Sequence, residues 1–345
     1  MGRCCTVLTW LVCLLSGLTV EAGATVHVEA LATVLDHDVE VPARSALDEP
    51  LNLASGTKLL VRVAVKGSNQ SLDIALFSDT EFQKLDAGQD GQAEDGTVQR
   101  VEGSGGFLVS IERAGIWHLV LDNTRATSAS RTVTVYAVAT GGEGTRETRE
   151  LEAIYKDRYG GLKELFNFQD FDIVVTLCGE PNAYSAPTIT MCYELFDRLD
   201  EQGVPEAELF VFMHEVAHSL LNQWGLPLFD NEDAADEMAT VLLMLLEQKD
   251  AAVKAAQWWS QESSVDEALS ALVMDDRHTL SAQRARNIAN WLQDPDDRQL
   301  RWERLVIPQM TTNALTESLK PGAGASEAER SLARQELGRR GVAVK

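Results

Sequence analysis

His214, Glu215 and His218 form the clearest chemical pattern in the chain, in the order His-Glu-x-x-His. On a helix, residues four positions apart lie one turn above each other, so both imidazoles can bind one metal ion. Glu215 then lies beside the metal, where its carboxylate can take a proton from water. The alternative is an accidental match, which is rare in a chain with six histidines. The pattern favours hydrolytic chemistry at a zinc ion.

The residues around this pattern predict the helix that must carry it. Gly203 and Pro205 suit the beginning of a helix, and Gly225 followed by Pro227 suits its end. The run Leu209–Met213 is apolar on all sides, so the helix is expected to be buried. Buried imidazoles need a partner, and a metal ion would supply it.

A second helix is predicted to begin within the acidic segment 230–237. Glu232 and Asp236 lie four positions apart, on one face of this helix. A catalytic zinc needs a third protein ligand, for which Glu232 is the candidate. Asp236 can accept a hydrogen bond from the other nitrogen of a ligating histidine. The alternatives are a carboxylate-rich helix N-terminus, which the helix dipole favours, and a weak calcium site.

His278 and Arg284 are the two candidates for stabilising the oxyanion of a tetrahedral intermediate. His278 lies in a charged stretch just before a predicted helix, and Arg284 lies on that helix. The alternative roles are a helix cap for His278 and a surface salt bridge for Arg284.

The composition excludes several other classes of protein. The chain has 345 residues, of which 45% are hydrophobic and 24% charged, and this balance excludes a disordered or collagen-like protein. Its length predicts about two domains. The net charge of −23 repels phosphate backbones, so we expect no nucleic-acid partner.

The beginning of the chain predicts a signal peptide that covers residues 1–24. Arg3 precedes the apolar run Val7–Leu18, and small residues follow at 22–24. The run is shorter than the ~20 residues of a membrane-spanning helix, although an uncleaved anchor is the alternative. The signal peptide predicts an exported protein, either periplasmic or secreted. No later segment is long and apolar enough to cross a bilayer, so we expect no transmembrane segment once the signal is removed.

Two cysteines lie outside this predicted signal. Cys4, Cys5 and Cys13 are within it, whereas Cys178 and Cys192 belong to the mature chain. In an oxidising compartment the latter two are expected to form a disulfide, and two buried free thiols are the alternative.

The chain divides by pattern into a β-rich part and a largely helical part. Residues 25–140 are predicted to form an antiparallel β-sandwich, residues 146–320 an α+β catalytic domain, and residues 321–345 a C-terminal tail. The helical part has one expected β segment, at Phe171–Leu177. The candidate strands of the sandwich are Leu59–Val65, Leu72–Phe77, Gly106–Ile111, Trp117–Leu121 and Thr132–Val138.

Between Tyr155 and Trp302 the chain resembles a known group. His-Glu-x-x-His followed by Glu-x-x-x-Asp is similar to the gluzincin pattern of thermolysin-like metallopeptidases. The wider segment also resembles an uncharacterised family of exported bacterial metallopeptidases. The motifs that carry the resemblance are CGEPNAY at 178–184, MCYEL at 191–195, HEVAH at 214–218, EDAAD at 232–236 and HTLSAQR at 278–284.

The resemblance implies a zincin-like domain, mainly helical with a small sheet, and a defined set of roles. These roles are zinc ligands at His214, His218 and Glu232, a general base at Glu215, and a hydrogen-bond acceptor at Asp236. The interval between His218 and Glu232 is shorter than in thermolysin. Asp233, Asp236 and Glu237 therefore stay open as alternative third ligands.

Asn182, Ala183 and Tyr184 are similar to the edge-strand segment that binds extended peptides in thermolysin-like enzymes, where backbone groups pair with the substrate. An ordinary turn after Pro181 is the alternative. If the two mature cysteines pair, their disulfide brackets this segment and holds it in place.

We therefore expect a zinc-dependent peptidase that acts on a peptide or protein substrate. The alternative is a catalytically degenerate metal-binding or envelope-binding exported protein that acts through its β-sandwich. Metal without turnover would indicate the degenerate form, and protein without stoichiometric zinc would indicate a binding module whose motif is accidental.

Overall fold

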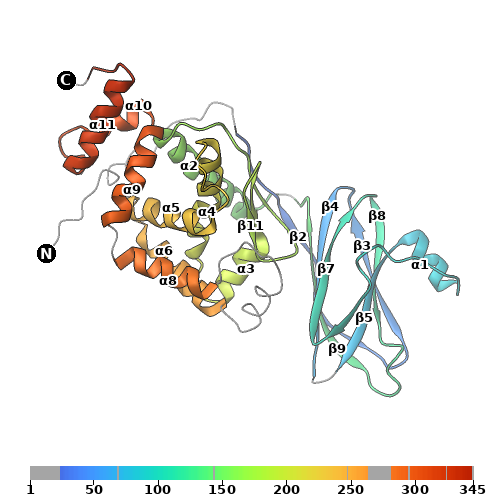
Figure 1. Cartoon of the computed structure of the whole chain (residues 1–345). Coiled ribbons are helices and arrows are strands. Elements are labelled where there is room, and N and C mark those ends of the chain that lie inside the picture. The colour runs from blue at the N-terminus through green and yellow to red at the C-terminus, as the bar shows by residue number, and fades with distance from the viewer. Residues whose placement is uncertain are drawn as a thin grey trace. The chain divides into compact units, whose positions relative to one another are not determined.

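The computed structural model describes residues 24–67, 70–142, 144–246, 248–262, 281–293, 296–323 and 325–343. They form two compact units. The first consists of Val28–Glu150 and Thr176–Glu180, and the second of the residues up to His27, Leu151–Val175 and Pro181–Lys345. The first unit is rich in strands and the second is mainly helical (Figure 1). The predicted order of a β-rich part followed by a helical part is therefore confirmed.

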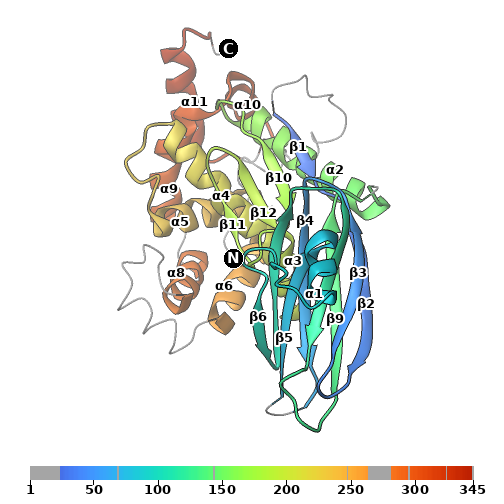
Figure 2. The same cartoon turned by 90° about the vertical axis from the view of Figure 1, so that its right-hand side faces the viewer.

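The β-rich unit contains two four-stranded antiparallel sheets, with strand orders β2-β9-β4-β7 and β3-β8-β5-β6 (Figure 2). One short helix, α1 (Asp79–Asp86), follows β5. The strands are β2 (Leu31–Val41), β3 (Ala46–Leu53), β4 (Thr57–Val65), β5 (Ser71–Ser78), β6 (Gln99–Glu102), β7 (Ser104–Ile111), β8 (Gly115–Asp122) and β9 (Arg131–Thr140).

Alternating side chains of the two sheets build one shared core, as in a β-sandwich. In β4, Leu59, Val61 and Val63 are buried, whereas the intervening Arg62 is only half-buried and Ala64 is exposed. Strands β3, β5, β6 and β8 of the other sheet contribute to the same core. Burying each large apolar side chain stabilises the fold by roughly 1.5–3 kcal/mol.

The helical unit contains a small four-stranded sheet in the order β1-β10-β12-β11. Its strands are β1 (Val26–Val28), β10 (Ile173–Thr176), β11 (Ala183–Tyr184) and β12 (Ile189–Cys192). Strand β10 lies within the predicted β segment Phe171–Leu177. Strand β1 was expected in the sandwich, but it neighbours β10 instead, and the amide of Ile173 donates to the carbonyl of Thr25 (2.9 Å). Among the described strands, β11 lies at an edge of this sheet and pairs with β12.

Helices make up most of the second unit. For the region 321–345 the sequence leaves a tail or a frayed helix open, and the structure has a helix there with a capping box at Ser326 and Glu329 and with Ala333 and Leu337 buried. The helices are α2 (Arg146–Leu165), α3 (Tyr193–Glu201), α4 (Ala207–Gln223), α5 (Glu232–Leu245), α6 (Lys249–Glu262), α8 (Ser281–Gln293), α9 (Asp296–Val306), the short η2 (Ile307–Gln309), α10 (Thr312–Ser318) and α11 (Glu327–Arg339).

Helix α4 begins and ends where its flanking residues predict. Gly203 and Gly225 both adopt positive φ angles, of 69° and 67°, which suit glycine on either side of the helix. Helix α5 begins after Asn231, whose side chain accepts a hydrogen bond from the amide of Ala234 (2.8 Å). The two helices pack against each other (Figure 1). This packing brings the first turn of α5 to the middle of α4.

The predicted signal peptide lies outside the described residues, apart from Ala24. Within the described part of the chain, none of the helices has both the length and the apolar character needed to span a bilayer.

Candidate metal centre

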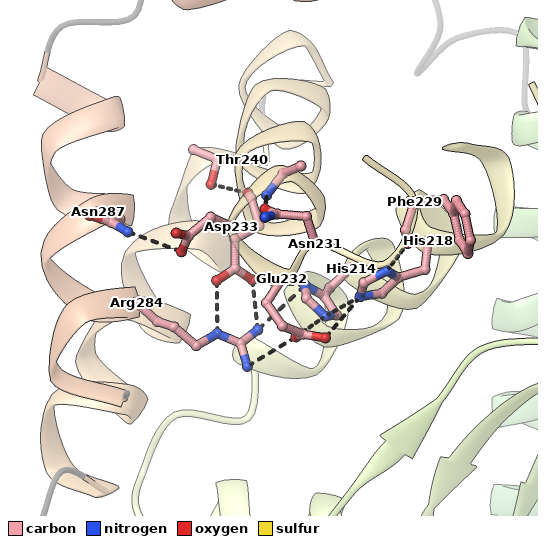
Figure 3. Close-up of polar contacts among 11 residues, drawn as sticks. His214, His218, Phe229, Asn231, Glu232, Asp233, Thr240, Arg284 and Asn287 are labelled. Carbon is pink, nitrogen blue, oxygen red and sulfur yellow. Dashed lines mark hydrogen bonds and ion pairs between the residues drawn. The ribbon is translucent and has the colours of Figure 1, made fainter. Parts of the chain in front are cut away.

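His214, His218 and Glu232 converge on one point between α4 and α5 (Figure 3). The Nε2 atoms of the two histidines lie 3.1 Å apart. The Glu232 carboxylate lies 3.2 Å from Nε2 of His214 and 3.4 Å from Nε2 of His218. All three side chains are largely buried. The structure thus brings together the three residues that the sequence predicts as metal ligands.

The second nitrogen of each imidazole is engaged away from this point. Nδ1 of His214 lies 2.8 Å from a carboxylate oxygen of Asp236, and Nδ1 of His218 lies 2.6 Å from the carbonyl oxygen of Phe229. Each Nδ1 therefore donates its hydrogen, so each Nε2 of a neutral imidazole can present a lone pair to a metal ion. These two nitrogens and the Glu232 carboxylate face one another, and a cation between them would stabilise this arrangement. Ligating histidines are typically held in this way.

The distances among these three groups fit a tetrahedral metal ion. With zinc–nitrogen and zinc–oxygen distances of about 2.0–2.1 Å, two tetrahedral ligands lie roughly 3.4 Å apart. The three separations here are 3.1, 3.2 and 3.4 Å. Two imidazoles and one carboxylate are also the donor types that catalytic zinc sites use. The residues present therefore fit a zinc ion.

Tertiary contacts separate Glu232 from Asp233, Asp236 and Glu237, the other three candidates for the third ligand. Asp233 accepts a hydrogen bond from Nδ2 of Asn287 (3.2 Å), and Glu237 pairs with Arg301. Asp236 faces Nδ1 of His214 rather than the Nε2 atoms. Glu232 is thus the carboxylate that the structure places at the ligand position.

Asp236 is completely buried and is held by Arg284 of α8. Nε and Nη2 of Arg284 donate to the two carboxylate oxygens at 2.8 and 2.6 Å, a bidentate pairing. The guanidinium also lies over the ring of Trp259, 4.0 Å from its centroid. Burial raises the pKa of the Asp236 carboxyl, but Arg284 and His214 outweigh it and hold that pKa below its usual value. Asp236 therefore stays ionised and orients His214.

The charges around His214 favour a positive charge at this point. Burial alone would lower the pKa of the imidazole, but Asp236 and Glu232 raise it to about 9. Burial also raises the pKa of Glu232, yet hydrogen bonds from His214 and His218 hold it well below its usual value. Without a metal, a proton on His214 therefore takes the place of the cation.

Zinc binding is expected to release this proton near neutral pH. Because the pKa of His214 is about 9, its imidazole is protonated below that pH and must lose the proton to bind zinc. Glu232 is ionised throughout this range, so it gives no opposing change. Apparent zinc affinity should rise by about tenfold per pH unit toward pH 9. Calorimetry in buffers of different ionisation enthalpy measures the released proton, and zinc binding without proton release would contradict the prediction.

The Asp236→Asn variant should weaken both the metal site and the fold. Loss of the carboxylate leaves Arg284 buried without its charged partner, which typically destabilises a protein by about 3–5 kcal/mol. Loss of the acceptor for His214 should weaken zinc binding by about 10–100-fold. Denaturant unfolding and zinc titration measure the two effects. Asp233→Asn is the matched control, because Asp233 lies three positions earlier and contacts Asn287 instead; equal effects of both variants would contradict the assignment.

An open cleft of about 660 Å³ lies beside the three ligands. Glu215 lines it and is 8% exposed, so this carboxylate borders the same space as the ligands. The predicted substrate-binding residues Asn182, Ala183 and Tyr184 line the cleft as well. Ala183 and Tyr184 form the edge strand β11. The structure therefore places an edge strand next to the candidate ligands.

The two oxyanion candidates have different outcomes. Arg284 lines the cleft, but two of its nitrogens donate to Asp236, and its Nη1 lies 3.9 Å from Glu232. Its observed contacts thus orient Asp236, and its role toward an oxyanion stays a prediction. His278 lies outside the described residues.

Cys178 and Cys192 form a disulfide, as the sequence predicts. Cys178 follows β10, Cys192 ends β12, and β11 lies between them in the chain. The two sulfurs lie close to the carboxylate of Glu194, but the disulfide leaves neither of them as a thiolate ligand.

One contact of the site could not be predicted from the sequence. The carbonyl of Phe229 accepts the hydrogen bond from His218, and because every residue type has a backbone carbonyl, no residue identity marks this contact. The role of Trp259 as a platform for Arg284 also depends on the approach of α6 and α8, which pack against each other.

Comparison with known proteins gives limited similarity. No curated protein sequence matches the chain. Similar solved structures include Aeromonas hydrophila PliG, a periplasmic inhibitor of g-type lysozyme, with 16% identity over 34% of this chain and 97% of that chain and a TM-score of 0.23. A chain of Bacillus endospore appendages has 15% identity over 36% and 97%, with a TM-score of 0.22. The IMPa metallopeptidase of Pseudomonas aeruginosa has 11% identity over 88% and 52%, with a TM-score of 0.15. Scores this low establish neither a shared fold nor a shared function.

A family match covers the part of the chain that carries the site. Residues 145–310 match the family DUF4344, which is described as "Putative metallopeptidase". This range includes both helices α4 and α5 and Arg284 of α8. The segment that holds the candidate metal centre is therefore similar to a family described as metallopeptidases.

Proposed function

We propose that the protein is a zinc-dependent peptidase of the gluzincin type, with a zincin-like fold in its helical unit. One observation carries the proposal: the ligand atoms of His214, His218 and Glu232 all lie within 4.8 Å of one another beside an open cleft. The match to a family described as metallopeptidases supports it.

Zinc is the metal that suits this set of donors. Imidazole nitrogen is a good ligand for zinc, whereas calcium and magnesium prefer oxygen ligands in larger number. Three protein ligands with one position left for water are typical of a catalytic zinc site, while structural sites use four. Among the described residues, the cluster that faces the cleft supplies three.

The mechanism assigns the proton transfers to Glu215. Zinc bound by His214, His218 and Glu232 would polarise the scissile carbonyl and make water more acidic. The Glu215 carboxylate takes a proton from the attacking water as the carbon–oxygen bond forms. It then delivers that proton to the leaving nitrogen as the carbon–nitrogen bond breaks. Burial beside the cleft keeps Glu215 within the low-dielectric surroundings in which such transfers are efficient.

Two further groups prepare the site for this chemistry. Asp236 and Arg284 fix His214 in the tautomer that leaves Nε2 free for the metal. Strand β11 lies at an edge of the small sheet and lines the cleft, where an extended peptide can add as a further strand. Stabilisation of the oxyanion by Arg284 or His278 is part of the proposal.

We also propose that the protein works outside the cytoplasm, in the periplasm or as a secreted protein. The disulfide between Cys178 and Cys192 supports this proposal, because oxidising compartments favour such bonds.

Metal analysis combined with a peptide-library digest tests the proposed function. Purified protein should contain about one zinc ion per chain. It should cleave peptides, lose the activity with a chelator, and regain it when zinc is added. Stoichiometric zinc without cleavage of any peptide would favour the degenerate metal-binding alternative. Absence of stoichiometric zinc would contradict the proposal outright.

A further inference from the structure

One carboxylate that lines the cleft has no role in the proposed mechanism. Arg284 pairs with Asp236 through two hydrogen bonds. Glu232 faces the two histidines, and Glu215 is the proposed base. Asp230 also lines the cleft and is exposed. Among the described residues, none forms a hydrogen bond or an ion pair with its carboxylate. Asp230 is therefore a carboxylate that a substrate can reach in this cleft.

Asp230 lies next to an exposed aromatic residue, on the His218 side of the site. The carbonyl of Phe229 accepts the hydrogen bond from Nδ1 of His218, which fixes this piece of backbone beside the metal ligands (Figure 3). The Phe229 side chain is 44% exposed and the preceding Leu228 is 45% exposed. Because Phe229 lines the cleft, its ring offers apolar surface to a ligand there.

A carboxylate beside an exposed aromatic ring suits a long basic side chain. Lysine and arginine have an apolar stem that packs on hydrophobic surface and a cationic end that remains hydrated or paired. The same cationic end is attracted by an aromatic ring and by a carboxylate. Asp230 would repel an acidic side chain at this place, and the guanidinium of Arg284 in the same cleft is already paired with Asp236.

We propose that the cleft recognises its peptide substrate through a lysine or arginine side chain, whose stem packs on Phe229 and whose charge pairs with Asp230. The proposal rests on the proposed peptidase function and names the class of substrate. Because Phe229 contacts His218 through its carbonyl, the bound basic residue would lie close to the bond that is cleaved. The proposal makes Asp230 a specificity-determining residue and gives it no part in the chemical step.

A series of peptides that carry one lysine at each position in turn tests this inference by binding measurements alone. A short fluorescent alanine-based peptide carries one lysine, which is moved through every position, and a matched series carries glutamine. Zinc-loaded Glu215→Gln protein is titrated with each peptide, so that cleavage does not interfere. At one or two positions, lysine should bind about fivefold more tightly than glutamine. Adding Asp230→Asn should reduce this ratio below about twofold.

Two further variants control for a general effect of charge. Asp157→Asn removes an exposed carboxylate of α2 that does not line the cleft, and it should leave the lysine preference unchanged. Asp230→Lys should reverse the preference toward a matched glutamate series. Equal binding of lysine and glutamine peptides at every position, or a preference that survives Asp230→Asn, would overturn the inference.

The outcomes for this inference and for the proposed function are distinguishable. A wild-type protein that shows the lysine preference in binding but cleaves no peptide supports the inference and contradicts the peptidase function. Cleavage without any preference for a basic residue leaves the peptidase function intact and overturns the inference.

Discussion

The Glu215→Gln variant is expected to lose peptide hydrolysis by at least 10²–10⁴-fold, roughly the range that general acid–base catalysis contributes. Glutamine keeps the size of the side chain but cannot accept the proton of the attacking water. The ligands His214, His218 and Glu232 are unchanged, so the variant should bind zinc as wild type does. Turnover of the best library peptide and zinc content per chain measure the two expectations.

Glu206→Gln provides the matched control for this substitution. Glu206 is exposed at the beginning of α4 and its side chain makes no capping hydrogen bond. The Glu206→Gln variant should therefore retain wild-type turnover. If Glu215→Gln hydrolysed the peptide at the wild-type rate, Glu215 would not be the base. If it lost zinc together with activity, the loss of turnover would reflect a damaged metal site.

The Glu232→Gln variant should bind zinc at least about 100-fold more weakly than wild type, a larger loss than the ~10–100-fold typical of residues that only orient ligands. A neutral amide replaces the one anionic donor, which lies 3.2 Å from His214 and 3.4 Å from His218. Competition with a zinc chelator of known affinity measures the change.

Asp233→Asn separates the loss of a ligand from the loss of charge near the site. This variant removes the same charge at the neighbouring position, where the wild-type carboxylate contacts Asn287 of α8. Zinc affinity should change by no more than about threefold, as expected for a screened nearby charge. An equal loss in both variants would mean that the acidic segment acts by charge alone and that Glu232 is not a ligand.

Local spacing predicted the two histidines and their helix, because the interval of four positions fixes their relation on any α-helix. It also placed Glu232 and Asp236 on one face of a second helix. Spacing could not choose among the four acidic candidates for the third ligand. That choice depends on partners far away in the chain: Asn287 engages Asp233, and Arg301 engages Glu237.

The sandwich was predictable where buried and exposed residues alternate. All five candidate strands lie within β4, β5, β7, β8 and β9. Strands β2 and β3 were missed, because they are rich in acidic residues and largely half-buried or exposed, so little apolar pattern marks them. Strand β6 lies in the segment 86–105, which is rich in Gly, Asp, Glu and Gln and therefore predicts an exposed loop between two strands. Its Val101 is nevertheless buried in the core.

The remaining differences come from contacts that only the folded chain creates. Strand β1 is three residues long, and only its pairing with β10 assigns it to the small sheet. Helix α11 has a weakly apolar sequence, but burial of Ala333 and Leu337 stabilises it. The sequence offered Arg284 only as an oxyanion candidate, whereas its contacts with Asp236, Glu232 and the ring of Trp259 depend on the folded chain.

X-ray diffraction from zinc-loaded crystals, recorded on both sides of the zinc absorption edge, tests the central claim most directly. The account predicts one anomalous peak bonded to Nε2 of His214, Nε2 of His218 and the carboxylate of Glu232, at about 2.0–2.2 Å. A solvent molecule should complete the coordination on the side of the cleft. A peak elsewhere, or a fourth ligand from the protein that closes the open position, would contradict it.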